Sequence, residues 1–101
     1  MSQERRTDER ASTNLPTRWV GMNDGGAHDA HISDIGLGGC FINTAPRVNI
    51  DEIITLEIQL PSGDWLPLRG EVMSCKPGVG FGLNFTFLTD DEVIALRQFV
   101  L

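Results

Sequence analysis

Three arginines lie close together near the N-terminus: Arg5, Arg6 and Arg10. A planar guanidinium donates two parallel hydrogen bonds to a phosphate, and it can also pair with the O6 and N7 atoms of guanine or stack on the base. Three such groups within six residues can converge on one anionic ligand. The alternative is an ordinary solvated terminus, because the first ten residues also hold three acidic side chains.

A second candidate site is the run Asp34-Ile35-Gly36-Leu37-Gly38-Gly39. A carboxylate at the end of a strand can accept hydrogen bonds from the N–H groups of guanine. Glycines such as Gly36 and Gly39 allow a flat ligand to approach the backbone closely. The alternative is a hairpin corner in which the glycines supply positive φ angles.

Other patterns that suggest chemistry lack the context that the chemistry needs. The glycine-rich run 78–85 precedes a strand, whereas a dinucleotide-binding fold needs a helix after such glycines. His28 and His31 are three apart on an expected strand and therefore face opposite sides, which disfavours a shared metal ion. The acidic run 90–92 is explained by helix capping. We find no nucleophile–base pair and no metal-ligand set, and so expect a binding domain rather than an enzyme or a metalloprotein.

The charge distribution restricts the partners. The chain has a net charge of −6, all of which arises after residue 10. A binder of DNA or RNA normally carries a basic face, so nucleic acid is not an expected partner. No apolar run is long enough to insert in a membrane, and the polar N-terminus is not a secretory signal. We expect a cytoplasmic protein in which Cys40 and Cys75 are small buried hydrophobes.

The elements that must position these residues form one all-β domain. Short apolar segments alternate with turn signals, and Ile54, Leu56 and Ile58 follow a period of two. Thr89 and Glu92 form a capping box, which predicts a helix over 89–101 that packs on the strands. We expect a flexible arm over 1–16 and a six-stranded antiparallel barrel with a terminal helix over 17–101. The expected strands are 17–22, 27–35, 40–44, 53–60, 65–75 and 80–87.

Together, these motifs resemble the PilZ domain family of cyclic di-GMP receptors. That family carries an Arg-x-x-x-Arg motif in an N-terminal arm and an Asp/Asn-x-Ser-x-x-Gly motif on the barrel. Arg6 and Arg10, preceded by Arg5, have the spacing of the first motif, and the run from Asp34 to Gly39 matches the second. The resemblance implies that Arg5, Arg6, Arg10, Asp34, Gly36 and Gly39 bind cyclic di-GMP, with no further cofactor.

Gly36 departs from this pattern, because the family prefers serine there. The run from His31 to Gly36 keeps a serine and the last glycine but replaces the aspartate by histidine, so we favour the register that begins at Asp34. Loss of the hydroxyl removes one potential hydrogen bond, worth roughly 0.5–1.5 kcal/mol, or about tenfold in affinity at most.

Two functional hypotheses follow. In the first, cyclic di-GMP orders the arm over the barrel, and a downstream protein recognises the changed surface. In the second, the domain is a ligand-independent protein-interaction module of the PilZ type, as in type IV pilus assembly or motility. The intact arginine motif favours the first hypothesis, and Gly36 favours the second.

Overall fold

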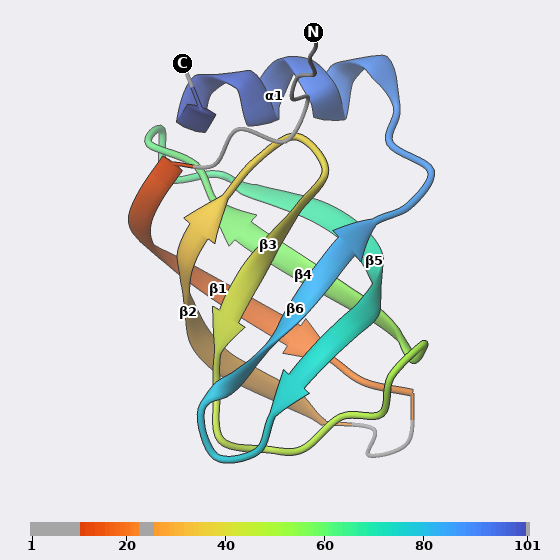
Figure 1. The fold of residues 1–101 in the computed structure, drawn as a ribbon. Helices are drawn as coiled ribbons and strands as arrows, with labels where there is room; N and C mark the ends of the chain where they lie inside the picture. The colour runs from red at the N-terminus through yellow and green to blue at the C-terminus, as the bar shows by residue number, and fades with distance from the viewer. Residues whose placement is uncertain (1–10, 23–25, 101) are drawn as a thin grey trace, which may run out of the picture.

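The computed structural model describes residues 11–22 and 26–100, which form six strands and one helix (Figure 1). The strands form a closed barrel in the order β1-β2-β3-β6-β5-β4, and every neighbouring pair is antiparallel. The expected all-β barrel with a terminal helix is therefore confirmed. The elements are β1 (Ala11–Val20), β2 (Ala27–Ile35), β3 (Gly39–Asn43), β4 (Ile53–Gln59), β5 (Trp65–Lys76), β6 (Gly80–Phe85) and α1 (Asp90–Val100).

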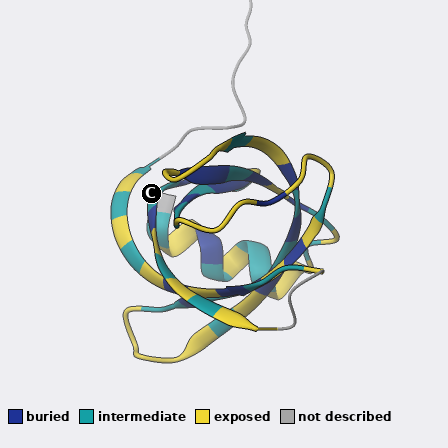
Figure 2. Cartoon of the chain, turned by 90° about the horizontal axis from the view of Figure 1, so that it is seen from below, coloured by how far each residue is buried: buried dark blue, intermediate teal, exposed yellow. Residues whose placement is uncertain are grey.

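Alternating burial explains why these segments form a barrel wall. In β4, the side chains of Ile54, Leu56 and Ile58 are buried, whereas those between them lie on the outside. The opposite faces of a strand take alternate residues, so each strand contributes one apolar row to a common interior. Figure 2, which looks along the barrel, shows the buried positions in the wall and α1 across the far end.

Trp19 of β1 is a large member of the core. Its ring is 1% exposed and meets Phe81 edge to face, with the ring centroids 5.1 Å apart. Its indole N–H donates to the Thr44 hydroxyl at 3.2 Å, which satisfies the polar atom that burial would otherwise leave unpaired. Cys40 is fully buried, as expected, whereas Cys75 is half-buried at the edge of the core.

Helix α1 begins with the predicted capping box. The Thr89 hydroxyl accepts from the N–H of Glu92 at 3.2 Å, and the Glu92 carboxylate accepts from the N–H of Thr89 at 2.9 Å. Leu96 is fully buried and Phe99 packs against the core, so one face of the helix closes the end of the barrel. No helix in the described part of the chain is long and apolar enough to cross a membrane.

Strand β1 begins six residues earlier than expected, at Ala11 instead of Thr17. Residues 11–16 alternate between half-buried and exposed, but the half-buried positions hold small or polar residues along with Leu15, so the pattern is weak in the sequence. They pair with β2, whereas pairing with β4 begins only at Thr17. A segment paired on one side tolerates Pro16, which has no N–H to donate. The expected start of the first strand, Thr17, is therefore six residues too late.

Candidate functional site

A β-bulge in β2 controls the placement of Asp34. The residues Ile32 and Asp34 of β2 pair with the adjacent residues Ile42 and Phe41 of β3, so β2 has one extra residue here. Both Ile32 and Ile35 are fully buried although they are three positions apart. The bulge makes this possible, because it leaves Asp34 half-exposed on the outside of the wall while the isoleucines on either side of it face the core.

Asp34 borders a hollow of about 340 Å³ on the outer wall of the barrel, formed by strands β2, β3, β5 and β6. We call it the Asp34 hollow. A second register shift, between Val72 and Ser74 of β5, puts both Met73 and Ser74 on the outside. Two bulges thus supply side chains to one hollow. Its lining consists of Asp34, Cys40, Phe41, Met73, Ser74, Gly82, Leu83 and Asn84.

The lining combines polar groups with apolar surface. The Asp34 carboxylate accepts hydrogen bonds, the Ser74 hydroxyl donates and accepts, and the Asn84 amide does both. Phe41 is half-buried and Met73 is 58% exposed, so a ring and a thioether are available to the flat face of a ligand. The volume lies at the lower end of the range for small-molecule sites, about 300–1,000 Å³.

The two glycines of the candidate motif have structural roles of their own. Gly36 lies between β2 and β3, is buried, and donates its N–H to the carbonyl of Gly39 at 2.8 Å. A Cβ on Gly39 would overlap the backbone oxygen of Leu83 in β6, so only glycine permits this approach of β3 to β6. The alternative of a corner that needs positive φ is wrong for Gly38 and Gly39, since among the described glycines the positive φ angles belong to Gly63 and Gly78.

Arg5, Arg6 and Arg10 lie outside the described residues. The first described residue, Ala11, pairs with Ile35, and Ser12 pairs with Asp34. The chain that carries the arginines therefore joins the barrel at the same edge as Asp34. Although residues 11–16 were expected to belong to the arm, they are the part of β1 that creates this junction.

Sequence reasoning missed the contribution of β5 and β6. Ser74 has no motif around it, and Met73 looks like one more apolar residue of a strand. Asn84 belongs to the glycine-rich run 78–85, to which no ligand was assigned. The exposed pair Met73 and Ser74 is the consequence of a bulge, which breaks the period of two. The only signal in the sequence is the polar Ser74 directly after the apolar pair 72–73, which is too weak to locate a bulge.

The comparisons with known proteins agree with this architecture. The family model "PilZ domain" matches residues 4–101. The PilZ domain of YcgR from Escherichia coli, solved with c-di-GMP, has a TM-score of 0.78 at 13% identity, over 96% of this chain and 89% of that chain. The PilZ domain of CeSA from a cellulose-synthesizing bacterium has a TM-score of 0.71 at 14% identity, over 90% and 93% of the two chains.

A third structure is the Bacillus subtilis inhibitor of motility MotI/DgrA, with a TM-score of 0.74 at 17% identity. The match covers 97% of this chain but only half of that protein. None of the curated proteins compared with the chain matches its sequence. These structural likenesses agree on the fold, and the family model covers nearly every residue, so the chain is a member of the PilZ domain family.

Proposed function

We propose that this domain binds cyclic di-GMP in the Asp34 hollow and that it acts as a receptor rather than as an enzyme. The observation that carries the proposal is the junction of Ala11 with Ile35, because it brings the chain that follows Arg10 to the edge where the bulge presents Asp34. The relative YcgR, whose PilZ domain has been solved with c-di-GMP, supports the choice of ligand.

Each group has a role suited to this ligand. Arg6 and Arg10, assisted by Arg5, hold phosphate oxygens and guanine edges through charge-assisted hydrogen bonds. Asp34 accepts from the N–H groups of one guanine. Phe41 and Met73 cover part of a base, because both offer apolar surface beside the carboxylate. Gly36 and Gly39 leave the backbone near the base without side chains.

The consequence for signalling is a change of surface. Ligand binding draws the segment that carries the arginines onto the barrel and adds negative charge beside an acidic domain. A downstream protein that recognises this face then distinguishes the bound from the free form. The ordering of residues costs part of the interaction energy, so the affinity is lower than the contacts alone would give.

Isothermal titration calorimetry with cyclic di-GMP tests the binding step. The parent domain should give saturable heat, and the double variant R6A/R10A should bind at least about 100-fold more weakly, since two charged hydrogen-bonding groups are worth about 3 kcal/mol or more. The matched control is R47A/R97A, which removes the same charge from two exposed positions that do not line the hollow. Equal losses in the two double variants would refute a specific arginine clamp.

A second pair of variants tests the hollow itself. Asp34→Asn should weaken binding about 10- to 100-fold, because one charged acceptor is lost. Asp29→Asn changes an aspartate of the same strand that pairs with Arg18 of β1 and does not line the hollow, and it should leave binding unchanged. No heat from the parent at any concentration would refute the receptor function. The remaining candidate would then be the ligand-independent interaction module, which is favoured by glycine instead of serine at position 36.

A further inference from the structure

Phe87, in the connection between β6 and α1, is an aromatic residue held in solvent. Its side chain is 84% exposed and its backbone φ is +53°. A positive φ is unfavourable for a bulky residue, and such outliers persist only where the surrounding structure holds them. Contacts that fix Phe87 outward therefore suggest that the ring has a partner.

Arg69 of β5 supplies these contacts. Its Nη2 donates to the Phe87 carbonyl at 2.9 Å, and its own carbonyl accepts from the N–H of Thr86 at 3.0 Å. The same guanidinium lies 3.6 Å from the carboxylate of Glu92, which belongs to the capping box of α1. Arg69 thus holds the connection at Thr86 and Phe87 and also contacts Glu92 at the start of α1. An aromatic side chain on a connection that is already ordered loses little entropy on association.

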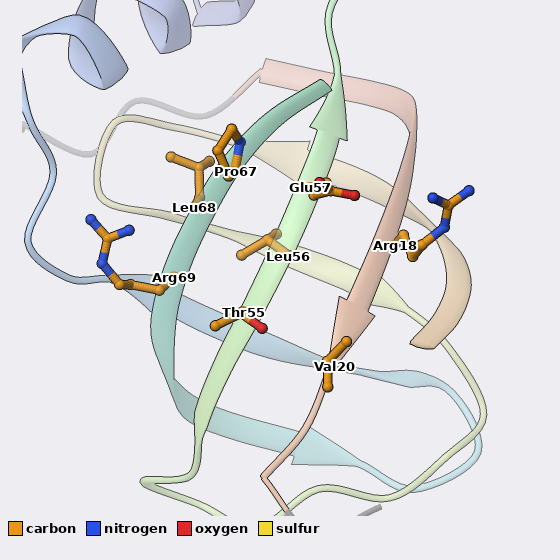
Figure 3. A pocket seen from close by; sticks show the side chains of 8 residues that line it. All are labelled: Arg18, Val20, Thr55, Leu56, Glu57, Pro67, Leu68 and Arg69. Carbon is orange, nitrogen blue, oxygen red and sulfur yellow. The ribbon is translucent and has the colours of Figure 1, made fainter. Parts of the chain in front are cut away.

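A groove lies directly beside this connection, on the outer wall formed by β1, β4 and β5 (Figure 3). Its volume is about 320 Å³, which accommodates one aromatic side chain. The groove is lined by Val20, Thr55 and Pro67, among others. Arg18 and Arg69 lie on opposite sides of it. We call it the Arg18–Arg69 groove.

The charges around Phe87 and around the groove are complementary. Asp90 and Asp91, both exposed, follow Phe87 in the first turn of α1. The charged residues that line the groove are Arg18, Arg69 and Glu57, two cations and one anion. The groove is thus a positive region in a chain whose net charge is −6, and most other surfaces of a second copy would repel an acidic segment. An aromatic residue flanked by carboxylates matches an apolar groove bordered by guanidiniums.

We propose that two copies of this chain associate by placing Phe87 of each copy in the Arg18–Arg69 groove of the other. Arg69 lines the groove and also holds the Phe87 backbone, so the exposed Phe87 ring and the groove lie next to each other on one face. A two-fold axis then satisfies both contacts at once, as a closed symmetric dimer requires. This interface lies on β1, β4 and β5, it does not use the Asp34 hollow, and it does not depend on the proposed ligand.

Trp65 extends the same face. Its ring is partly exposed, and the guanidinium carbon of Arg18 lies 5.1 Å from the ring centroid. Arg18 also pairs with Asp29 at 3.2 Å, which holds the guanidinium at the rim. Since the aromatic anchors are few and the contact is small, we expect a weak dimer that forms with increasing concentration and loosens as salt screens the charges.

Sedimentation equilibrium of the full chain, from roughly 5 to 500 µM in low salt, tests the proposal. The parent should approach twice the monomer mass of 11.1 kDa. Phe87→Asn removes the ring but keeps a residue that tolerates positive φ, and should weaken association at least about tenfold. Thr55→Arg fills the groove and should do the same. The matched control is Ile94→Ser, at a residue that is 61% exposed on α1.

Mixing the two variants separates this arrangement from any other. Neither F87N nor T55R alone retains a complete contact, but a mixed dimer has one intact groove and one intact Phe87. An equimolar mixture should therefore associate more strongly than either variant alone, and circular dichroism should show that both variants are folded. A parent that stays monomeric throughout, a mixture that associates no better than its components, or an equal loss in I94S would overturn the proposal.

Discussion

Gly39→Ala is the substitution that best separates a structural role from a ligand-binding role. The resemblance to the PilZ family assigns Gly39 to the ligand, whereas the barrel gives it a second reason to be glycine. It pairs with Asn84 across the β3–β6 ladder, and an added Cβ would overlap the Leu83 carbonyl oxygen and lie 3.1 Å from the carbonyl carbon. Carbon atoms in favourable contact are about 3.5–4.0 Å apart, so the two strands must separate.

The expected cost follows from what has to move. The clashing atoms belong to the backbone, which cannot rotate away as a flexible side chain would. Overpacking a core costs about 1–3 kcal/mol, and a clash with a hydrogen-bonded strand belongs at the upper end. About 3 kcal/mol is a large part of the 5–15 kcal/mol that stabilises an ordinary domain. At about 4–8 °C per kcal/mol, the melting temperature should fall by roughly 12–24 °C.

Thermal and urea unfolding followed by circular dichroism measure this cost. Gly38→Ala is the matched control, because the adjacent glycine is exposed and a Cβ there meets nothing within 4 Å. It should be neutral or stabilise by about 0.4–1 kcal/mol, through the entropy of the unfolded chain. If Gly39→Ala unfolds within about 1 kcal/mol of the parent while cyclic di-GMP binding is lost, the packing argument is wrong and the glycine serves the ligand.

Three further substitutions test the fold and the site. Thr89→Ala removes the hydroxyl that caps α1 and should cost about 1 kcal/mol in urea unfolding, and an unchanged midpoint would contradict the importance of the cap. Trp19→Phe loses both ring volume and the hydrogen bond to Thr44, so we expect a loss of about 2 kcal/mol, and a loss below about 0.5 kcal/mol would show that the interior repacks. Gly36→Ser should tighten cyclic di-GMP up to about tenfold by calorimetry, and weaker binding by a stably folded variant would argue against a ligand contact at this position.

Much of the fold could be predicted because its elements carry strong local signals. The period of two in Ile54, Leu56 and Ile58 identified β4, and the turn glycines marked the ends of its neighbours. The pair Thr89 and Glu92 located the start of α1 to within one residue, because a capping box depends on side chains only three positions apart. The boundary of β1 was wrong, since residues 11–16 are held by pairing with a strand that is distant in sequence.

The candidate site was only half visible in the sequence. The arginines and Asp34 could be named because they form short motifs, but the residues opposite them could not. Met73 and Ser74 line the same hollow as Asp34 only because two bulges turn side chains outward at the same place on the barrel wall. Asn84 joins them through the ordinary alternation of β6. A bulge results from the pairing of two strands, so neither strand encodes it alone.

The sequence by itself determined which residues face the interior, where the helix begins and which charges are available to an anionic ligand, because these depend on neighbours within a few positions. Tertiary structure decided what lies next to what. Closure of the barrel brought the end of β2 beside β5 and β6, joined Ala11 to Ile35, and set Arg69 between Phe87 and its neighbouring groove. Such contacts join residues far apart in the chain, and their register is fixed only when all six strands bury their apolar faces together.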